Sequence, residues 1–410
     1  MTLALIGEMV LIALRAIWNN KLRSFLTILG NIVAVASIVT LVSLIQGITE
    51  EVTDVILSEV GADSFMVDRR GITNSEKLFR EARNNPRITL ADAAGIRRYA
   101  SNVTAVMVEG RQSGEVGYRE RILESVDVNG VTEEFIRFAT YNAEIGRLLT
   151  PTEIRLKRNV AVIGWDVADR LFEGLDPIER RIKIDGVTFR VVGVSSPKGS
   201  TFGMSQDEFA IIPLGAFRRL FGSKASLGLR VQPADPNEIT ASISETTMAL
   251  RIHRRLKASE SDNFGIISSD MALSLFNQAT TGIFAVLVGV VGLALVVAGI
   301  VIMNIMLMAV SERTKEIGLR KALGAKRADI MWQILTESVA LSMLGGIAGT
   351  TLGAVAALAL DQFAPVPASV HPWSIFLAIT LTATVGLFFG IYPASRAAAL
   401  DPIDALGRAD

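Results

Sequence analysis

The chain has 410 residues, half of them hydrophobic, with 41 basic and 41 acidic side chains and no cysteine. Its mean hydropathy of +0.41 is too high for an ordinary soluble protein, yet 20% of its residues are charged, so the two kinds of residue must be segregated along the chain. The balanced charge argues against a nucleic-acid-binding protein, and the lack of cysteine excludes disulfides, thiolate metal sites and a cysteine nucleophile.

The first membrane span is predicted at residues 25–47, about 23 residues without a charge. Before it, residues 1–24 are apolar but interrupted by charges, which is typical of an amphipathic segment on the cytoplasmic membrane surface. Basic residues before the span and acidic residues after it predict a cytoplasmic amino terminus. A cleaved signal peptide is disfavoured because the apolar run is too long. Asn31, inside the span, is predicted to bond another helix, with substrate passage as the alternative.

Residues 48–279 have a globular composition without another apolar run of spanning length, which predicts one large mixed α/β domain outside the membrane. A capping-box pattern beginning at Thr89 predicts a helix up to about Tyr99. Two β-rich runs flank Asp185-Gly186 and predict a hairpin. The remaining expected elements are strands at 159–163 and 227–231, a helix at 236–256 and a mobile loop at 69–87.

Three further apolar runs predict membrane helices at about 282–310, 334–360 and 375–392, within a second domain at 280–392. Residues 393–410 then form a predicted cytoplasmic tail. In the middle run, Gly345, Gly349 and Gly353 recur every four residues and make a smooth ridge on which another helix can pack closely. Packing within the subunit is the expected use of this ridge, and a contact between subunits is the alternative.

The segment 311–327 lies between two of these runs and carries six basic side chains, which predicts a cytoplasmic location. Its apolar residues recur at roughly helical spacing, so we expect a short amphipathic helix that ends at Gly324 and a new helix from about Arg327. A simple positive-inside anchor is the alternative interpretation of the segment.

Residues 312–325, ERTKEIGLRKALGA, resemble the signature of the FtsX-like permeases, the membrane subunits of one class of ABC transporter that includes the MacB proteins. In that family the segment rests on the cytoplasmic ATPase. The resemblance implies a small apolar knob with charges at its rim. The residues it points to are Glu312, Arg313, Glu316, Arg320, Ala322, Leu323, Gly324 and Ala325.

The external domain also resembles the MacB-type periplasmic core domain. The matching motifs are GRLLT at 146–150, NVAVIG at 159–164, LF at 171–172, DPI at 176–178 and the hairpin that ends in VVGV. Glu179 departs from the pattern, since the family commonly has glycine after DPI, and this makes the local turn uncertain. The first span, NNKLRSFLTILG, and the ending, YPASRAAALDPIDALG, are similar to the corresponding parts of MacB-like permeases.

The resemblance implies an α-helical membrane protein with four transmembrane helices and a large mixed α/β extracytoplasmic domain inserted between helices 1 and 2. It also implies a multi-pass protein of the inner membrane with both termini in the cytoplasm. Its function would be to couple ATP hydrolysis to movement of the external domain, for export or extraction of a substrate. MacB carries a fused ATPase, whereas these residues contain no GxxxxGK[ST] phosphate loop. We therefore expect a separate cytoplasmic ATPase to bind ATP and Mg²⁺, and no cofactor or metal on this chain.

Other expected partners are a second permease copy or a paralogue, most simply as a homodimer, and a periplasmic membrane-fusion protein. A non-transporting regulator that activates a cell-wall hydrolase, as FtsX does, is the alternative function. A membrane-anchored enzyme would need a catalytic site, and no GxSxG or HExxH motif is present.

Overall fold

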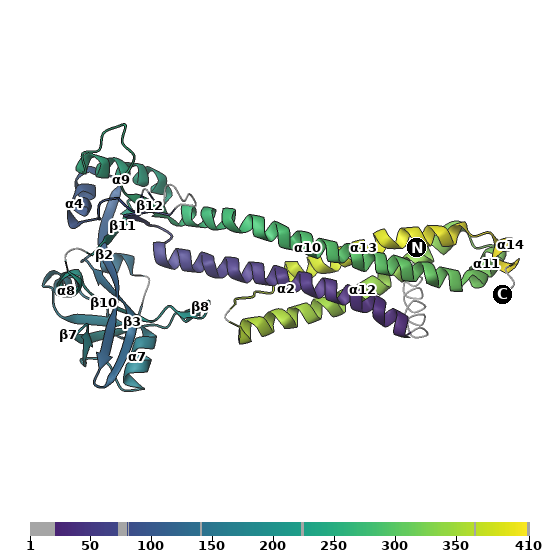
Figure 1. Ribbon diagram of the computed structural model, residues 1–410, viewed down its shortest axis with the longest axis horizontal. Coiled ribbons are helices and arrows are strands. Elements are labelled where there is room, and N and C mark those ends of the chain that lie inside the picture. The colour runs from purple at the N-terminus through teal and green to yellow at the C-terminus, as the bar shows by residue number, and fades with distance from the viewer. Residues whose placement is uncertain are drawn as a thin grey trace. The chain divides into compact units, whose positions relative to one another are not determined.

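The computed structural model describes residues 21–72, 80, 82–139, 142–222, 225–364 and 366–407. It divides into two compact units, one made of residues up to 50 together with those from 280 onward, and the other of residues 51–279. We call them the helical unit and, after its predicted location, the external unit (Figure 1). The predicted membrane-surface segment 1–24 lies outside the described residues as far as residue 20.

Four long helices are apolar enough to cross a membrane in the described part of the chain. They are α2 (Lys21–Val60), α10 (Ser269–Glu312), α12 (Arg327–Phe363) and α13 (Pro372–Ala399). Among the described residues, the helical unit also contains two short helices, α11 (Thr314–Ala322) and α14 (Pro402–Gly407). The chain therefore has the four membrane-spanning candidates that the apolar runs predict, with the mixed α/β unit between the first and the second.

Each long helix continues beyond its apolar run. At about 1.5 Å per residue, the 44 residues of α10 extend about 66 Å, roughly twice the thickness of the hydrocarbon layer. Helix α13 passes through Pro393 and ends at Ala399 instead of Tyr392, because an alanine-rich sequence with high helix propensity follows the proline. Hydropathy thus locates the apolar core of each helix but not its ends.

The glycines of α12 let two other helices approach its backbone. Gly345, Gly349 and Gly353 face α2, where a Cβ on Gly349 would lie 2.8 Å from the carbonyl oxygen of Ile32. Another side of α12 meets α13, and there Ser338 Oγ donates a hydrogen bond of 2.9 Å to the carbonyl oxygen of Gly386. The glycine ridge is therefore used for packing inside this chain.

Asn31 forms the helix-to-helix hydrogen bond predicted for it. Its side chain is buried in α2, and Nδ2 donates to the carbonyl oxygen of Ser342 on α12 at 2.7 Å. The bond fastens α2 to α12 beside the glycine ridge.

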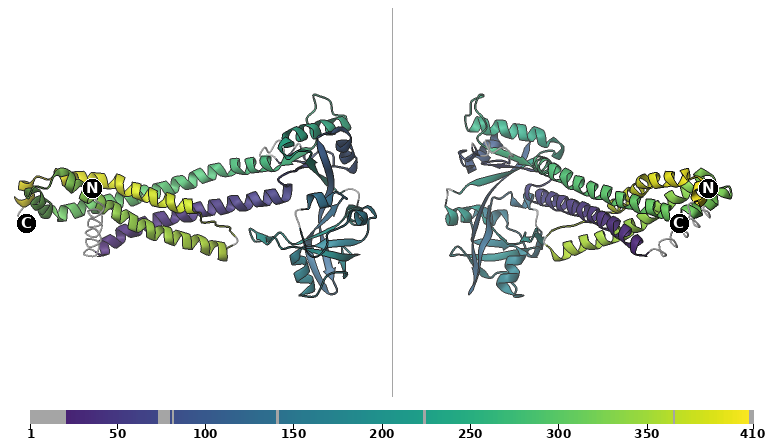
Figure 2. Two further views of the ribbon diagram at one scale, coloured as in Figure 1. Left: turned by 180° about the vertical axis from the view of Figure 1, so that it is seen from behind. Right: turned by 45° about the vertical axis from the view of Figure 1, so that its right-hand side comes forward.

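The external unit is built on a sheet of ten strands, seen from two further sides in Figure 2. The sheet strands are β1 (Phe65–Asp68), β2 (Val103–Tyr118), β3 (Arg121–Val131), β4 (Ala143–Gly146), β5 (Val160–Ile163), β6 (Arg181–Ile184), β7 (Val187–Ser195), β10 (Phe209–Pro213), β11 (Leu227–Pro233) and β12 (Gly265–Ser268). Two short strands, β8 (Ser200–Thr201) and β9 (Met204–Ser205), form a separate hairpin.

The strand order is β12-β1-β11-β2-β3-β10-β5-β7-β4, and β6 pairs with β2 and β7 off this path. Two pairs are parallel, β3 with β10 and β5 with β7, and the other pairs are antiparallel. The helices described in this unit are α4 (Leu90–Tyr99), α5 (Phe135–Phe138), α6 (Pro151–Arg155), α7 (Trp165–Phe172), α8 (Leu214–Phe221) and α9 (Ile239–His253), with a 3-10 turn η1 (Pro236–Glu238).

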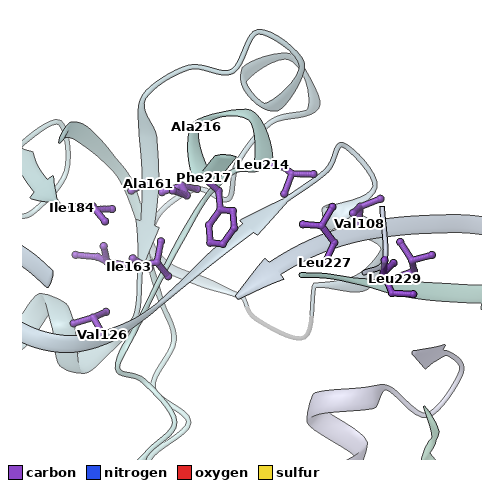
Figure 3. Close-up of a cluster of buried hydrophobic side chains, with 14 of the residues drawn as sticks. Val108, Val126, Ala161, Ile163, Ile184, Leu214, Ala216, Phe217, Leu227 and Leu229 are labelled. Atoms are coloured by element: carbon purple, nitrogen blue, oxygen red, sulfur yellow. The ribbon is translucent and has the colours of Figure 1, made fainter. Parts of the chain in front are cut away.

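The central strands are buried on both faces. In β5, Ala161 and Ile163 belong to one hydrophobic cluster, whereas Val160 and Val162 belong to the other. Burial on both faces explains why the strand reads as a continuous apolar run without alternation. Figure 3 shows the larger cluster, in which Phe217 of α8 points toward the strands.

Predicted local structure in the external unit is largely confirmed. Thr89 and Asp92 form the capping box that begins α4, and β6 pairs with β7 around Asp185-Gly186, both with positive φ. The described ends of the segment 69–87 are tied together, since Arg69 and Asn85 exchange side-chain-to-backbone hydrogen bonds.

The backbone at Glu179 keeps the turn that the family commonly makes with glycine. Its φ is +61°, in the left-handed region where glycine is favoured. The turn is kept because Glu179 donates its backbone N–H to Val191 and pairs with Arg190 at 2.7 Å.

One acid-sensitive contact holds the start of α6. The Arg147 guanidinium makes two hydrogen bonds to Glu153, of 2.7 and 2.8 Å, and Thr150 completes a capping box with the same carboxylate. These bonds, led by that from Arg147, lower the pKa of Glu153 from 4.5 to about 2. A carboxylate with a lowered pKa stabilises the folded state above its ordinary pKa, and this stabilisation is lost as the pH falls from about 4.5 toward 2.

We therefore expect Glu153→Gln to lower the unfolding free energy of the external unit by about 2 kcal/mol at pH 6 and by much less at pH 3. Urea titrations that follow Trp165, in a chain whose other tryptophans are phenylalanine, measure this difference. If Glu153→Gln lowers the unfolding free energy by the same amount at both pH values, the ionised carboxylate has no such role.

Candidate functional site

Helix α11 is the short helix expected between the second and third membrane helices. It ends in a Schellman arrangement, in which the N–H of Gly324 donates to Lys321 and the N–H of Ala325 donates to Arg320, at 3.0 and 3.1 Å. Gly324 has φ +100°, as this cap requires. Helix α12 then begins at Arg327, so the predicted break and both flanking helices are confirmed.

The inner face of α11 is held in place by packing. Ile317 is buried in a cluster with residues of α10, α12 and α13, among them Met306, Ile334 and Ala394. A Cβ on Gly318 would lie 2.5 Å from the Cβ of Ala405, so α11 also packs closely on α14.

Lys321 and Arg313 bind other helices of the chain. Lys321 Nζ donates to the carbonyl oxygens of Ala398 and Leu400, at 2.7 and 2.6 Å, where α13 ends. Arg313 pairs with Glu337 of α12 at 3.1 Å. Cations at the carboxyl end of a helix are favoured by its dipole and by its unpaired carbonyl groups. Helix α11 is thus fastened to α12 and α13 by directional bonds as well as by packing.

The predicted rim charges do not all face outward. Arg320 pairs with Glu316 at 2.6 Å and also donates to Gln333 of α12 at 2.8 Å. Glu316 remains exposed, as does Glu312 at the end of α10. Arg313 and Arg320 therefore position the segment, and the two acidic residues lie at its surface.

Part of the exposed surface of the segment is apolar. Leu323 is 81% exposed, Leu319 is 53% exposed and Ala322 is also exposed, whereas Ala325 is half-buried against the inner cluster. Ile403 on the adjoining α14 is 81% exposed. We call Leu319, Ala322, Leu323 and Ile403 the coupling surface, after the role proposed for them below. Large aliphatic side chains this exposed beside charged residues are typical of a protein-binding patch.

Sequence reasoning missed three parts of this site: the Lys321 contact, Glu337 and helix α14. Glu337 could have been found, because an acidic residue near the start of an apolar span is rare and usually paired. In the described part of the chain, no group of three His, Asp or Glu side chains is placed to hold a metal ion.

Comparison with known proteins gives two family matches. Residues 24–247 match the profile described as MacB-like periplasmic core domain, and residues 279–402 match the FtsX-like permease C-terminal profile. The macrolide export ATP-binding/permease protein MacB of Bdellovibrio bacteriovorus is 34% identical over 391 residues, which are 94% of this chain and 59% of that protein. The protein of the same name from Chlorobaculum tepidum is 34% identical over 395 residues, 96% of this chain and 60% of that protein.

The chain thus spans about three fifths of the length of these relatives. Among solved structures, the periplasmic region of MacB from Actinobacillus actinomycetemcomitans aligns over 54% of this chain and 95% of its own, with a TM-score of 0.44 at 17% identity. The two profile matches together cover nearly all of the described residues, and the chain belongs to the MacB-like, FtsX-like family of ABC transporter permeases.

Proposed function

We propose that this chain is the membrane subunit of an ABC transporter complex whose coupling surface docks on a cytoplasmic ATPase carried by a separate subunit. The proposal rests on two observations. Leu323 is highly exposed, and the other side of α11 is bonded to α13 through Lys321 and to α12 through Arg313. A partner can bind the apolar side chains, and the bonds behind α11 keep it from giving way when the partner moves.

The mechanism follows from this stiffness. Force applied at α11 reaches α12 through Arg313 and Glu337, and reaches α13 through Lys321. In the proposed complex, which contains two permease chains and two ATPases, ATP binding and hydrolysis shift α11, and the spans carry the movement to the external domain. The output is export or extraction of a substrate at the outer face, with a membrane-fusion protein as a further partner.

The assembly is tested by purification with and without a candidate ABC ATPase. Alone, the chain is expected neither to bind nor to hydrolyse ATP, because its sequence contains no phosphate loop. Coexpressed with its ATPase it is expected to copurify and to support ATP turnover. Robust turnover by the chain without any other subunit would refute the assignment. The alternative regulator of a cell-wall hydrolase requires the same docking, so movement of a substrate in reconstituted membranes distinguishes the two.

The proposed orientation is tested by reporters. The bias of basic residues predicts that a reporter fused near Arg111 lies outside the cytoplasm, and that reporters after Lys326 and at Asp410 lie inside. Residue 326 found outside the cytoplasm would place the coupling surface on the wrong side for any ATPase and would end the proposal.

A further inference from the structure

A basic groove of about 510 Å³ lies on the external unit, and none of its lining residues belongs to the coupling surface. Five cationic side chains line it, against two carboxylates. The cations are Arg97, Arg155, Lys157, Arg218 and Arg219, and the carboxylates are those of Glu133 and Glu134. The groove therefore carries a net of three positive charges in a protein whose overall charge is zero.

Both carboxylates are already neutralised inside the groove. Glu134 pairs with Arg97 at 2.6 Å, and Glu133 accepts two hydrogen bonds from Arg155, of 3.1 and 3.2 Å. The excess positive charge therefore belongs to Lys157, Arg218 and Arg219.

These three cations lack an anionic partner among the described residues. Arg219 donates to the backbone oxygen of Lys157 at 3.0 Å and to Asn159 Oδ1 at 2.7 Å, and both acceptors are neutral. In the same part of the chain, no hydrogen bond or ion pair involves the side chains of Lys157 and Arg218. Elsewhere in the external unit, Arg111, Arg121 and Arg170 each pair with a carboxylate at 2.5 to 2.9 Å.

The stem of Lys157 and the guanidinium of Arg219 are held in place before any ligand arrives. Lys157 has φ +51°, and its side chain lies across α8, where a Cβ on Gly215 would come within 2.3 Å of Lys157 Cγ. Helix α8 is fixed in turn by Phe217, whose ring packs over Gly130 of β3. A preformed site loses little conformational entropy on binding.

We infer that this groove binds a phosphate-bearing ligand. Three charges without an anionic partner match a group of about two to three negative charges, such as a phosphate monoester or a pyrophosphate. Two of them are arginines, whose planar forks suit phosphate oxygens. The volume suits a small ligand or headgroup rather than a protein segment. Leu90, which is exposed at the edge of the groove, offers an apolar contact beside the charges.

The test uses the full chain in nanodiscs of zwitterionic lipid, titrated calorimetrically with inorganic pyrophosphate at low ionic strength. Lys157→Gln and Arg218→Gln are each expected to weaken binding roughly tenfold, the usual effect of losing one charge-assisted hydrogen bond. Arg158→Gln is the matched control, because Arg158 is the exposed neighbour of Lys157 but does not line the groove. Its effect should be about twofold or less. Glu133→Gln should tighten binding, since it releases Arg155.

Failure of the wild-type chain to bind pyrophosphate, or equal weakening by Arg158→Gln and Lys157→Gln, would overturn the inference. Equal weakening would mean that the phosphate senses only the overall charge. The source of the phosphate is distinguished by glycerol 3-phosphate and a short-chain phosphatidic acid below its micellar concentration. Tighter binding of the lipid identifies a headgroup whose acyl chain contacts Leu90, and equal binding identifies a soluble phosphate compound. Neither outcome depends on ATPase docking.

Discussion

Leu323→Asp is expected to abolish both copurification of the ATPase and ATP-driven activity in reconstituted membranes. Leu323 is 81% exposed in this chain, so its replacement removes little packing from the permease itself. In the complex, the new carboxylate would be buried without a partner, and an uncompensated buried charge costs several kcal/mol. A loss of about 4 kcal/mol would weaken docking roughly a thousandfold.

Lys326→Ala is the matched control, because Lys326 is also exposed and lies three residues away. A charge at the rim of an interface contributes about 0 to 1 kcal/mol, so this variant should behave nearly as wild type. Glu316→Lys should be intermediate, since it replaces the partner of Arg320 with a like charge. If Leu323→Asp retains wild-type copurification and turnover, the segment serves only as a positive-inside anchor.

Arg254→Ala is expected to destabilise the external unit by about 3 to 5 kcal/mol. Arg254 of the segment after α9 and Asp92 of α4 have side chains only 9% and 5% exposed, and they form two hydrogen bonds, of 2.8 and 3.0 Å. Burial alone would raise the pKa of Asp92, but the bonds led by Arg254 reverse this, and the pKa is lowered. Removing the guanidinium therefore leaves a buried carboxylate without its main partner.

Hydrogen exchange of the full chain measures this effect, because the amides of α4 and α9 should exchange faster while those of α12 and α13 stay protected. Arg255→Ala is the control, since Arg255 is the exposed next residue and has no ion pair among the described residues. Equal acceleration in the two variants would show that the Arg254 pair contributes nothing beyond a surface charge.

Much of the fold follows from local rules that the sequence displays. A capping box specifies the start of α4 at Thr89, and Asp185-Gly186 specifies the hairpin between β6 and β7. Gly324 specifies the end of α11, because few other residues tolerate the left-handed conformation. Each of these features depends on residues within a few positions of one another, and the pattern alone identifies them.

The contacts that build the site join residues far apart in the chain, and no local pattern contains them. Lys321 binds the end of α13, 77 and 79 residues away, and Arg313 binds Glu337 one helix later. The glycine ridge predicts a close helix contact at Gly349, but only the fold shows that the neighbour is α2. The pairing of β3 with β10 is equally long-range, so the strand order could not be predicted from local sequence patterns.

The end of helix α13 depends on the position of α11, because Lys321 of α11 bonds to it. The carbonyl groups of Ala398 and Leu400 receive their donor from another helix and not from a glycine cap in their own segment. When α11 is displaced, these two oxygens lose their donor, and the last turn of α13 becomes free to unwind. Displacement of α11 is therefore expected to favour fraying of α13.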